Sequence, residues 1–394
     1  MVRFKRFLMI FFISLCSFSL FGIIPQKFVV ADSATETEQI LQEHTEKLIN
    51  ELDLQALQEY VQSLDGWAEE SVKERLLSYL KGDTFDYSHF WVQIREILFR
   101  NVRDMLPAFA CIAAIALLSG IISSLKSGTA NATTSNMIFL ISYATALIPL
   151  FAILTECFRV SLNAVHAMQK QMQLTFPLLL TLMSASGGVV SASVCKPAVA
   201  FFSTTIVSTI SGVVFPLTIT IIAFSIAGNL TKELKISKFS AFFKSINKWV
   251  IGICISAFGI FFTLQGITSA VYDGVVRRAA KYAIGNGIPI VGGFLSGGFD
   301  LAVAGSILIK NSLGSMSIFL MVGVLFEPLV LLISVNVLLR FTSAVTQPFG
   351  DSRISDFLGD TAENLNYCTA GLLFTAFMYF LTIMLFVFST EALL

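Results

Sequence analysis

A carboxylate lies inside one of the most apolar stretches of this 394-residue sequence. Glu327 is near the centre of the run MSIFLMVGVLFEPLVLLISVNVLL. A charged group at that depth in a bilayer costs about 2.5–3.5 kcal/mol on insertion scales, so such residues often serve ion or proton transfer. Lys196, Lys310 and Asp300 are candidate partners. The alternative is a carboxyl group that is protonated, or solvated in a groove of an assembly, without a transport role.

Two apolar segments, 174–195 and 288–309, are interrupted by glycines. Glycine permits positive φ and a close approach of backbones, which a turn at membrane depth requires. Non-helical backbone is tolerated there only if it is buried in protein or lines a hydrated cavity. We interpret both segments as re-entrant hairpins; the alternative is a glycine-rich helix packed tightly against its neighbours. The candidate hairpin residues are Pro177, Gly187, Gly188, Pro289, Gly292, Gly293, Gly297 and Gly298.

Residue patterns typical of enzymes do not occur in the sequence. His44, His89 and His166 are far apart, and the six cysteines form no paired zinc motif. There is also no Walker loop, no G-x-S-x-G elbow and no dinucleotide-binding glycine motif after a strand. We therefore expect no enzymatic activity, no metal and no other cofactor.

The elements that carry these residues are membrane helices. Hydrophobic residues make up 55% of the chain and charged residues 13%, and the mean hydropathy is +0.78, as in polytopic membrane proteins. Crossing a hydrocarbon core about 30 Å thick takes about 20 residues. Together with the two glycine-broken segments, the apolar stretches predict an all-α fold with about six to eight membrane segments in a domain over 105–394. The predicted full spans are 105–125, 137–155, 198–228, 249–268, 314–339 and 367–389.

The amino-terminal part of the chain has a different composition. Three basic residues precede an apolar run, and small residues follow it, so 1–31 is predicted to be a signal peptide; an uncleaved anchor is the alternative. Residues 32–104 carry 16 acidic and 7 basic side chains, with apolar positions at helical spacing. They are expected to form short amphipathic helices outside the cytoplasm. These helices are either a small core on the membrane surface or a docking surface for another exported protein.

Two pairs of prolines suggest an internal repeat, because each pair is 39 residues apart and the pairs are offset by 112 residues. At that offset, 137–228 matches 249–340 element by element, as in many transporters; chance is the alternative. The loop 229–248 carries five lysines against one acid, which favours the cytoplasm. With 32–104 outside, this requires 174–195 to enter and leave on the outer side. The carboxyl terminus is then also outside.

Four blocks of the sequence resemble the stage III sporulation protein AE family of endospore-forming bacteria. They are QLTFPLLLTLMSASGG, AVYDGVVRRAAKYAIGNGIPIVG, ILIKNSLG and TQPFGDSRISDFL. The resemblance implies a mother-cell membrane protein at the outer forespore membrane, with 32–104 facing the intermembrane space. It also implies a permease-like subunit of a transenvelope channel, or feeding tube, that late forespore gene expression under sigma-G requires.

The partners that the resemblance implies are the other membrane proteins of the stage III sporulation A operon and, through them, a forespore membrane protein. Lipid is expected to surround the helices, nucleic acid is not expected as a partner, and self-association is open. Two alternatives to the channel subunit are a stand-alone secondary transporter of a small solute and a purely structural anchor for the complex. The resemblance supplies no substrate and no catalytic residue.

Overall fold

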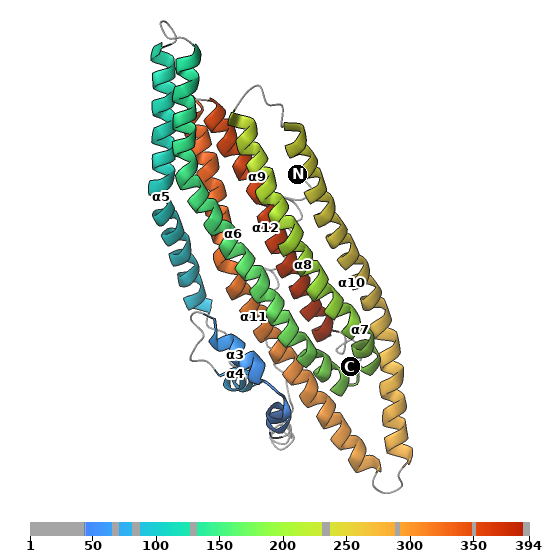
Figure 1. Ribbon diagram of the computed structural model, residues 1–394. Helices are drawn as coiled ribbons and strands as arrows, with labels where there is room; N and C mark the ends of the chain where they lie inside the picture. Colours follow the sequence, from blue (N-terminus) through green and yellow to red (C-terminus); the bar gives the residue numbers. More distant parts are fainter. Residues whose placement is uncertain are drawn as a thin grey trace.

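The fold of the chain is a bundle of long helices (Figure 1). Regular structure in the described residues is entirely helical, and six helical segments are long and apolar enough to cross a membrane. This confirms the predicted all-α polytopic fold. The predicted signal peptide, 1–31, and Pro289 lie outside the described residues. The computed structural model describes residues 43, 45–64, 71–80, 87–126, 132–230, 237–287, 292–348 and 352–388.

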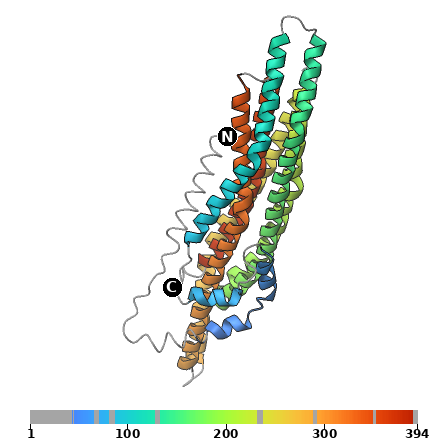
Figure 2. The ribbon, with the colours of Figure 1, turned by 90° about the vertical axis from the view of Figure 1, so that its left-hand side faces the viewer.

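Short helices precede the long ones. A helical stretch at 45–51 is followed by α3 (Gln55–Gln62) and α4 (Val72–Leu80). The long segments then alternate in direction and lie side by side (Figures 1 and 2). They are α5 (Tyr87–Lys126), α6 (Ala132–Ala185), the composite segment Val189–Leu230, α10 (Ser237–Gly287), α11 (Gly292–Thr346) and α12 (Ser352–Phe388). The composite segment consists of α7 (Val189–Phe201), the π-helix η1 (Phe202–Ile206), α8 (Val207–Thr209), the π-helix η2 (Ile210–Val214) and α9 (Phe215–Leu230).

Several helices are much longer than a bilayer requires. With 54 and 55 residues at about 1.5 Å each, α6 and α11 are both about 80 Å long, against a hydrocarbon core of about 30 Å. The structure therefore differs from the predicted boundaries. The predicted span 137–155 and the first half of 174–195 belong to one helix, α6, which continues through Pro177. The predicted domain boundary at residue 104 likewise falls inside α5.

The chain reverses between α6 and α7 and between α10 and α11 at one end of the bundle. The helix ends on either side of the lysine-rich loop lie at the opposite end, with the end of α5 and the beginning of α6 (Figure 1). The two glycine segments therefore lie at the ends of long helices. Separate re-entrant hairpins are not confirmed. The 112-residue repeat is not confirmed either. At that offset the turn at 186–188 corresponds to 298–300, which is helical within α11.

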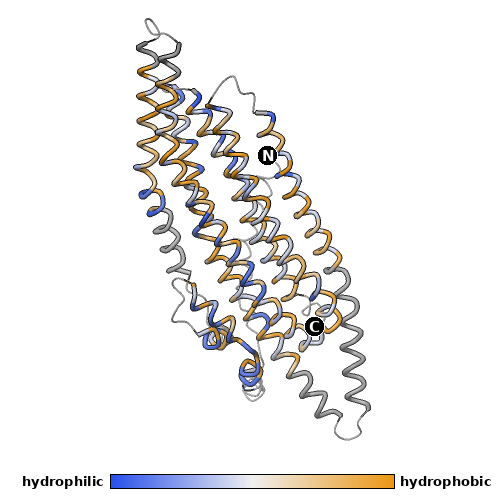
Figure 3. The backbone as a smooth tube through the Cα atoms, viewed as in Figure 1, coloured by the Kyte–Doolittle hydropathy of each residue, from blue (hydrophilic) through white to orange (hydrophobic). Residues whose placement is uncertain are grey.

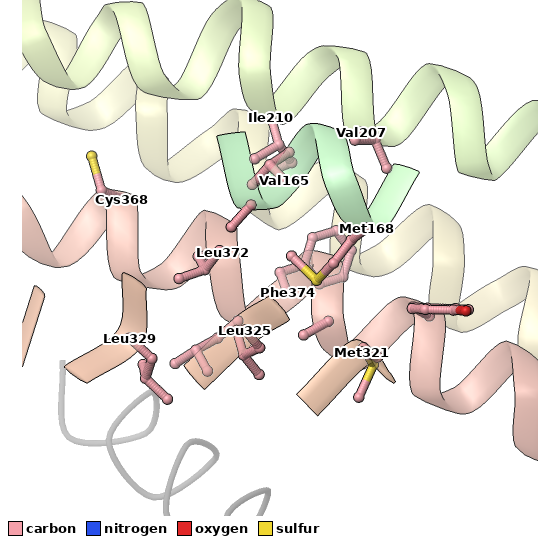
Figure 4. Packing of buried hydrophobic residues seen from close by; sticks show 14 of the residues in the cluster. Val165, Met168, Val207, Ile210, Met321, Leu325, Leu329, Cys368, Leu372 and Phe374 are labelled. Carbon is pink, nitrogen blue, oxygen red and sulfur yellow. The ribbon is translucent and has the colours of Figure 1, made fainter. Parts of the chain in front are cut away.

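The hydrophobic core runs along α6, α11 and α12. In the most apolar part of α12, 67% of residues are buried, compared with 28% in α5 and α10, so α12 is central and the other two are peripheral. Large apolar side chains also cover the outside of the bundle, where Ile148 of α6 is 72% exposed and Trp249 of α10 is 71% exposed. Such a surface suits contact with lipid (Figure 3). Figure 4 shows the core side chains Val165, Met168, Val207, Ile210, Met321, Leu325, Leu329, Cys368, Leu372 and Phe374.

The amino-terminal helices pack against the outside of α6 and α11. The Tyr60 hydroxyl donates a hydrogen bond to the Ala167 carbonyl at 3.1 Å, and the Lys170 ammonium lies 5.5 Å from the centre of the Tyr60 ring. Burial raises the pKa of the Tyr60 hydroxyl, which therefore remains a neutral donor at physiological pH. The apolar faces of these helices are thus turned toward the chain's own bundle.

Gly305 of α11 lies against the stretch 45–51. A Cβ atom there would lie 3.2 Å from Leu48 Cδ1 and 3.3 Å from Thr45 Oγ1. We expect Gly305→Leu to displace this stretch, because overpacking costs about 1–3 kcal/mol, and to speed tryptic cleavage after Lys47 about tenfold in the purified protein. Gly323→Ala is the matched control, since a Cβ there would meet no atom within 4 Å. An unchanged cleavage rate in Gly305→Leu would contradict the docked arrangement.

Candidate functional site

The turn between α6 and α7 is built on glycine. Gly187 has φ 98°, a conformation that side-chain-bearing residues rarely adopt. Its N–H donates to the Ser184 carbonyl at 3.1 Å, and the Gly188 N–H donates to the Met183 carbonyl at 2.9 Å. These bonds satisfy carbonyls at the end of α6 that would otherwise lack partners. The turn therefore brings α7 back alongside α6 after three residues.

The other predicted hairpin residues do not share this geometry. Gly292 and Gly293 begin α11, and Gly297 and Gly298 are helical within it. Pro177 lies inside α6, exposed on the side that faces α7. Of the two glycine segments, only the first therefore forms a described helix–turn–helix site.

A groove of about 450 Å³ lies between α6 and the α7–η1 segment. Its wall includes Phe176, Pro177 and Leu180 from α6, and Thr204 from η1. Of the described residues that line it, Lys196 alone carries a charge. The groove therefore joins an apolar wall to a few polar groups, a combination typical of ligand sites.

Four polar side chains meet behind this groove, at the junction of α6, α11 and α12. Gln171 donates from Nε2 to the Ser317 carbonyl at 3.0 Å, and the Tyr379 hydroxyl lies beside Thr175 and Ser317. None of the four is more than 1% exposed. Gln171 Oε1 has no hydrogen-bond partner among the described residues, and the Thr175 and Tyr379 hydroxyls, although close enough to interact, are not in hydrogen-bonding geometry. We call these four residues the polar cluster.

Phe176 separates the groove from the polar cluster. Its ring lines the groove, yet it is only 4% exposed. The ring centre lies 5.4 Å from that of Tyr379 and 5.6 Å from that of Phe386, both edge to face. Phe176 thus contacts both the groove and Tyr379, whereas Thr175, the residue before it, lies within the polar cluster.

Lys310 is completely buried near the end of α12. Its ammonium donates to the Val387 carbonyl at 2.9 Å, where the partial negative charge of a helix carboxyl end favours a cation. Lys310 and Glu327 are 17 residues apart on α11, which is about 25 Å along the helix. The predicted pairing of these two residues is therefore wrong.

Glu327 is exposed and makes no ion pair or hydrogen bond with any described residue, Lys196 included. Because α6 and α11 are antiparallel and meet at Gln171 and Ser317, Glu327 lies at about the level of Ser161. The exposed ion pair of Glu156 and Arg159, at 2.7 Å, is close to that level. Glu327 is thus close in level to charged side chains of α6.

We expect Glu327→Gln to leave sporulation within about twofold of wild type, because no described group depends on the charge and exposed polar substitutions usually change stability by less than about 0.5 kcal/mol. The measurement is the count of heat-resistant spores. A fall of a hundredfold or more, with normal amounts of protein in the membrane, would instead assign Glu327 a proton-transfer role.

Side-chain amides from neighbouring helices donate to both π-helices. Gln169 on α6 donates to the Ser203 carbonyl in η1, and Asn247 on α10 donates to the Val214 carbonyl in η2, each at 3.5 Å. Asn247 also donates to Thr218 Oγ1 at 3.0 Å. A π-helix leaves a carbonyl short of its usual partner, and such segments are frequent at functional sites. Both π-helices lie in the segment that returns from the glycine turn.

Sequence reasoning missed the polar cluster and the π-helices. The available signal was an amide, hydroxyl or phenol at a helix position flanked by apolar residues. Many other polar residues in the same helices have that signal. Only the packing of three helices distinguishes the residues that meet.

A bundle of six long, apolar helices with polar side chains in its interior defines a polytopic α-helical membrane protein. The chain belongs to the stage III sporulation protein AE family, whose model matches residues 71–390. It is similar to the stage III sporulation protein AE of Bacillus subtilis (strain 168), with 25% identity over 323 residues, which are 81% of this chain and 80% of that protein. No solved structure matches the chain. It is therefore a sporulation membrane protein.

Proposed function

We propose that the protein is an integral, permease-like subunit of the transenvelope channel complex between the mother cell and the forespore. In this role it contributes to late forespore gene expression under sigma-G. The observation that carries the proposal is the polar cluster behind the groove. A bundle that served only as an anchor would gain nothing from buried, unpaired polar atoms, because each costs about 1–3 kcal/mol. Polar groups inside an apolar bundle are instead expected where a passage runs through it.

The proposed location is the mother-cell membrane around the forespore, with the amino-terminal helices in the intermembrane space. Two observations support this orientation. The lysine-rich segment 229–248 favours the cytoplasm, and α3 and α4 lie toward the other end of the bundle (Figure 1). The proposed partners are the other membrane proteins of the same operon and, through them, a forespore membrane protein.

The protein would act by forming or scaffolding a passage, without catalysing a reaction and without a cofactor. Among the described residues, no group of three or more histidine, cysteine, aspartate or glutamate side chains is arranged to hold a metal ion. Lipid is the proposed surrounding of the exposed apolar faces, and nucleic acid has no proposed role.

Deletion of the coding sequence in its host tests this proposal. We expect arrest after engulfment, with small forespores and a silent sigma-G reporter, and recovery when the wild-type gene is restored. Normal spores would contradict the proposed role.

A double substitution distinguishes a membrane passage from a purely structural anchor. Gln171→Leu combined with Thr175→Val keeps the shape of α6 but removes two of the buried polar groups. A passage predicts loss of reporter activity with normal membrane levels of the protein, whereas an anchor predicts normal activity. Solute uptake by the purified protein in liposomes, without partners, would favour a stand-alone transporter.

A further inference from the structure

We infer that the polar cluster binds a small, uncharged, hydrogen-bonding molecule of about the size of water, and that the Phe176 ring closes its route from the groove. The inference rests on the proposed passage role and names the class of molecule that the site takes. The cluster consists of Gln171, Thr175, Ser317 and Tyr379.

The unpaired atoms of the cluster suit a neutral guest. Gln171 Oε1 accepts hydrogen bonds, whereas the hydroxyls of Thr175 and Tyr379 can both donate and accept. A buried water typically makes two to four hydrogen bonds to groups of this kind. Three such atoms converge from α6 and α12, and the Ser317 carbonyl next to them already accepts a bond from Gln171.

Charge argues against an ion at this position. No member of the cluster is ionised at neutral pH, so a buried ion would have no opposite charge beside it and would be strongly disfavoured. The buried ammonium of Lys310 is seven residues from Ser317, about 10 Å along α11, and is bonded to the Val387 carbonyl. The cluster therefore selects neutral molecules.

The route from the groove passes the Phe176 ring. The ring packs edge to face on Tyr379, so a rotation of the Phe176 side chain toward the groove would uncover the cluster. Pro177 follows directly and cannot donate to the Gln173 carbonyl four residues earlier. The helix therefore lacks one backbone hydrogen bond in the turn that carries the ring.

Cysteine accessibility tests the route. Thr175→Cys would be placed in full-length protein whose native cysteines are replaced, in lipid nanodiscs, and its alkylation by neutral iodoacetamide would be timed. We expect slow reaction with Phe176 present and at least tenfold faster reaction after Phe176→Ala. Leu180→Ala is the matched control, because it truncates another nearly buried residue of the groove wall. Equal acceleration by both substitutions, or by neither, would overturn the closing role of Phe176.

Tyr379→Phe tests whether the polar cluster holds a bound neutral molecule. If the cluster holds a bound neutral molecule, loss of the hydroxyl removes hydrogen bonds and lowers the melting temperature of the purified protein. If the cluster is dry, loss of an unpaired buried hydroxyl raises the melting temperature and overturns the binding inference. Both measurements use isolated protein, so their failure leaves the deletion test of the channel role unaffected.

Discussion

Gly187→Val is expected to disrupt the turn between α6 and α7 and to abolish complementation of a deletion strain. Valine at φ 98° is strained by about 1–3 kcal/mol, and its branched side chain adds to the crowding. The loss would concentrate at the turn, because the bonds to the Ser184 and Met183 carbonyls require the present backbone. Thermal unfolding of the purified protein and counts of heat-resistant spores measure the two effects.

Two control variants make this result specific. Gly259→Ala replaces a glycine inside α10 where a Cβ would meet no atom within 4 Å, so it should be neutral or stabilise by up to about 1 kcal/mol. Gly187→Asn should be intermediate, because asparagine tolerates positive φ better than valine does. Wild-type stability and activity in Gly187→Val would remove the turn from the functional site.

Gly314→Leu is expected to destabilise the junction of α11 and α12 by about 2.5–6 kcal/mol, the sum of overpacking and a lost hydrogen bond to a charged group. A Cβ at Gly314 would lie 2.6 Å from Val387 Cγ2 and 3.4 Å from Ile383 Cγ2. The leucine would push the last turn of α12 away and separate the Val387 carbonyl from the Lys310 ammonium. Chemical unfolding of the purified protein measures the loss.

A compensating substitution tests whether the clash is the cause. Gly314→Ala alone should be destabilising, and Val387→Ala in the same chain should recover most of that loss, since it removes the nearest methyl group. Additive losses in the double variant would show that the close approach to Val387 is not what makes Gly314 necessary.

The polar cluster and the groove share one helix, α6, which forms the wall between them. Phe176 of this helix lines the groove, and its ring contacts Tyr379 of the polar cluster. Tyr60 of α3 also bonds to α6, at Ala167, one turn before Gln171. A partner that moved α3 would thus act on the helix that carries the site.

The fold class, the membrane helices and the family could be recognised from the sequence alone. Hydropathy over about 20 residues is a local property, and it decides whether a segment can cross a lipid core without reference to the rest of the chain. The blocks that resemble the family are local as well.

Tertiary structure decided everything that depends on which residues meet. Glycine permits a turn but does not require one, so Gly187 turns whereas Gly297 and Gly298 continue a helix, and composition cannot choose between these outcomes. Glu327 has the most conspicuous position in the sequence, yet packing leaves it exposed and unpaired among the described residues. Gln171, Thr175, Ser317 and Tyr379 are individually ordinary, and they become a site only because three distant helices bury them against one another.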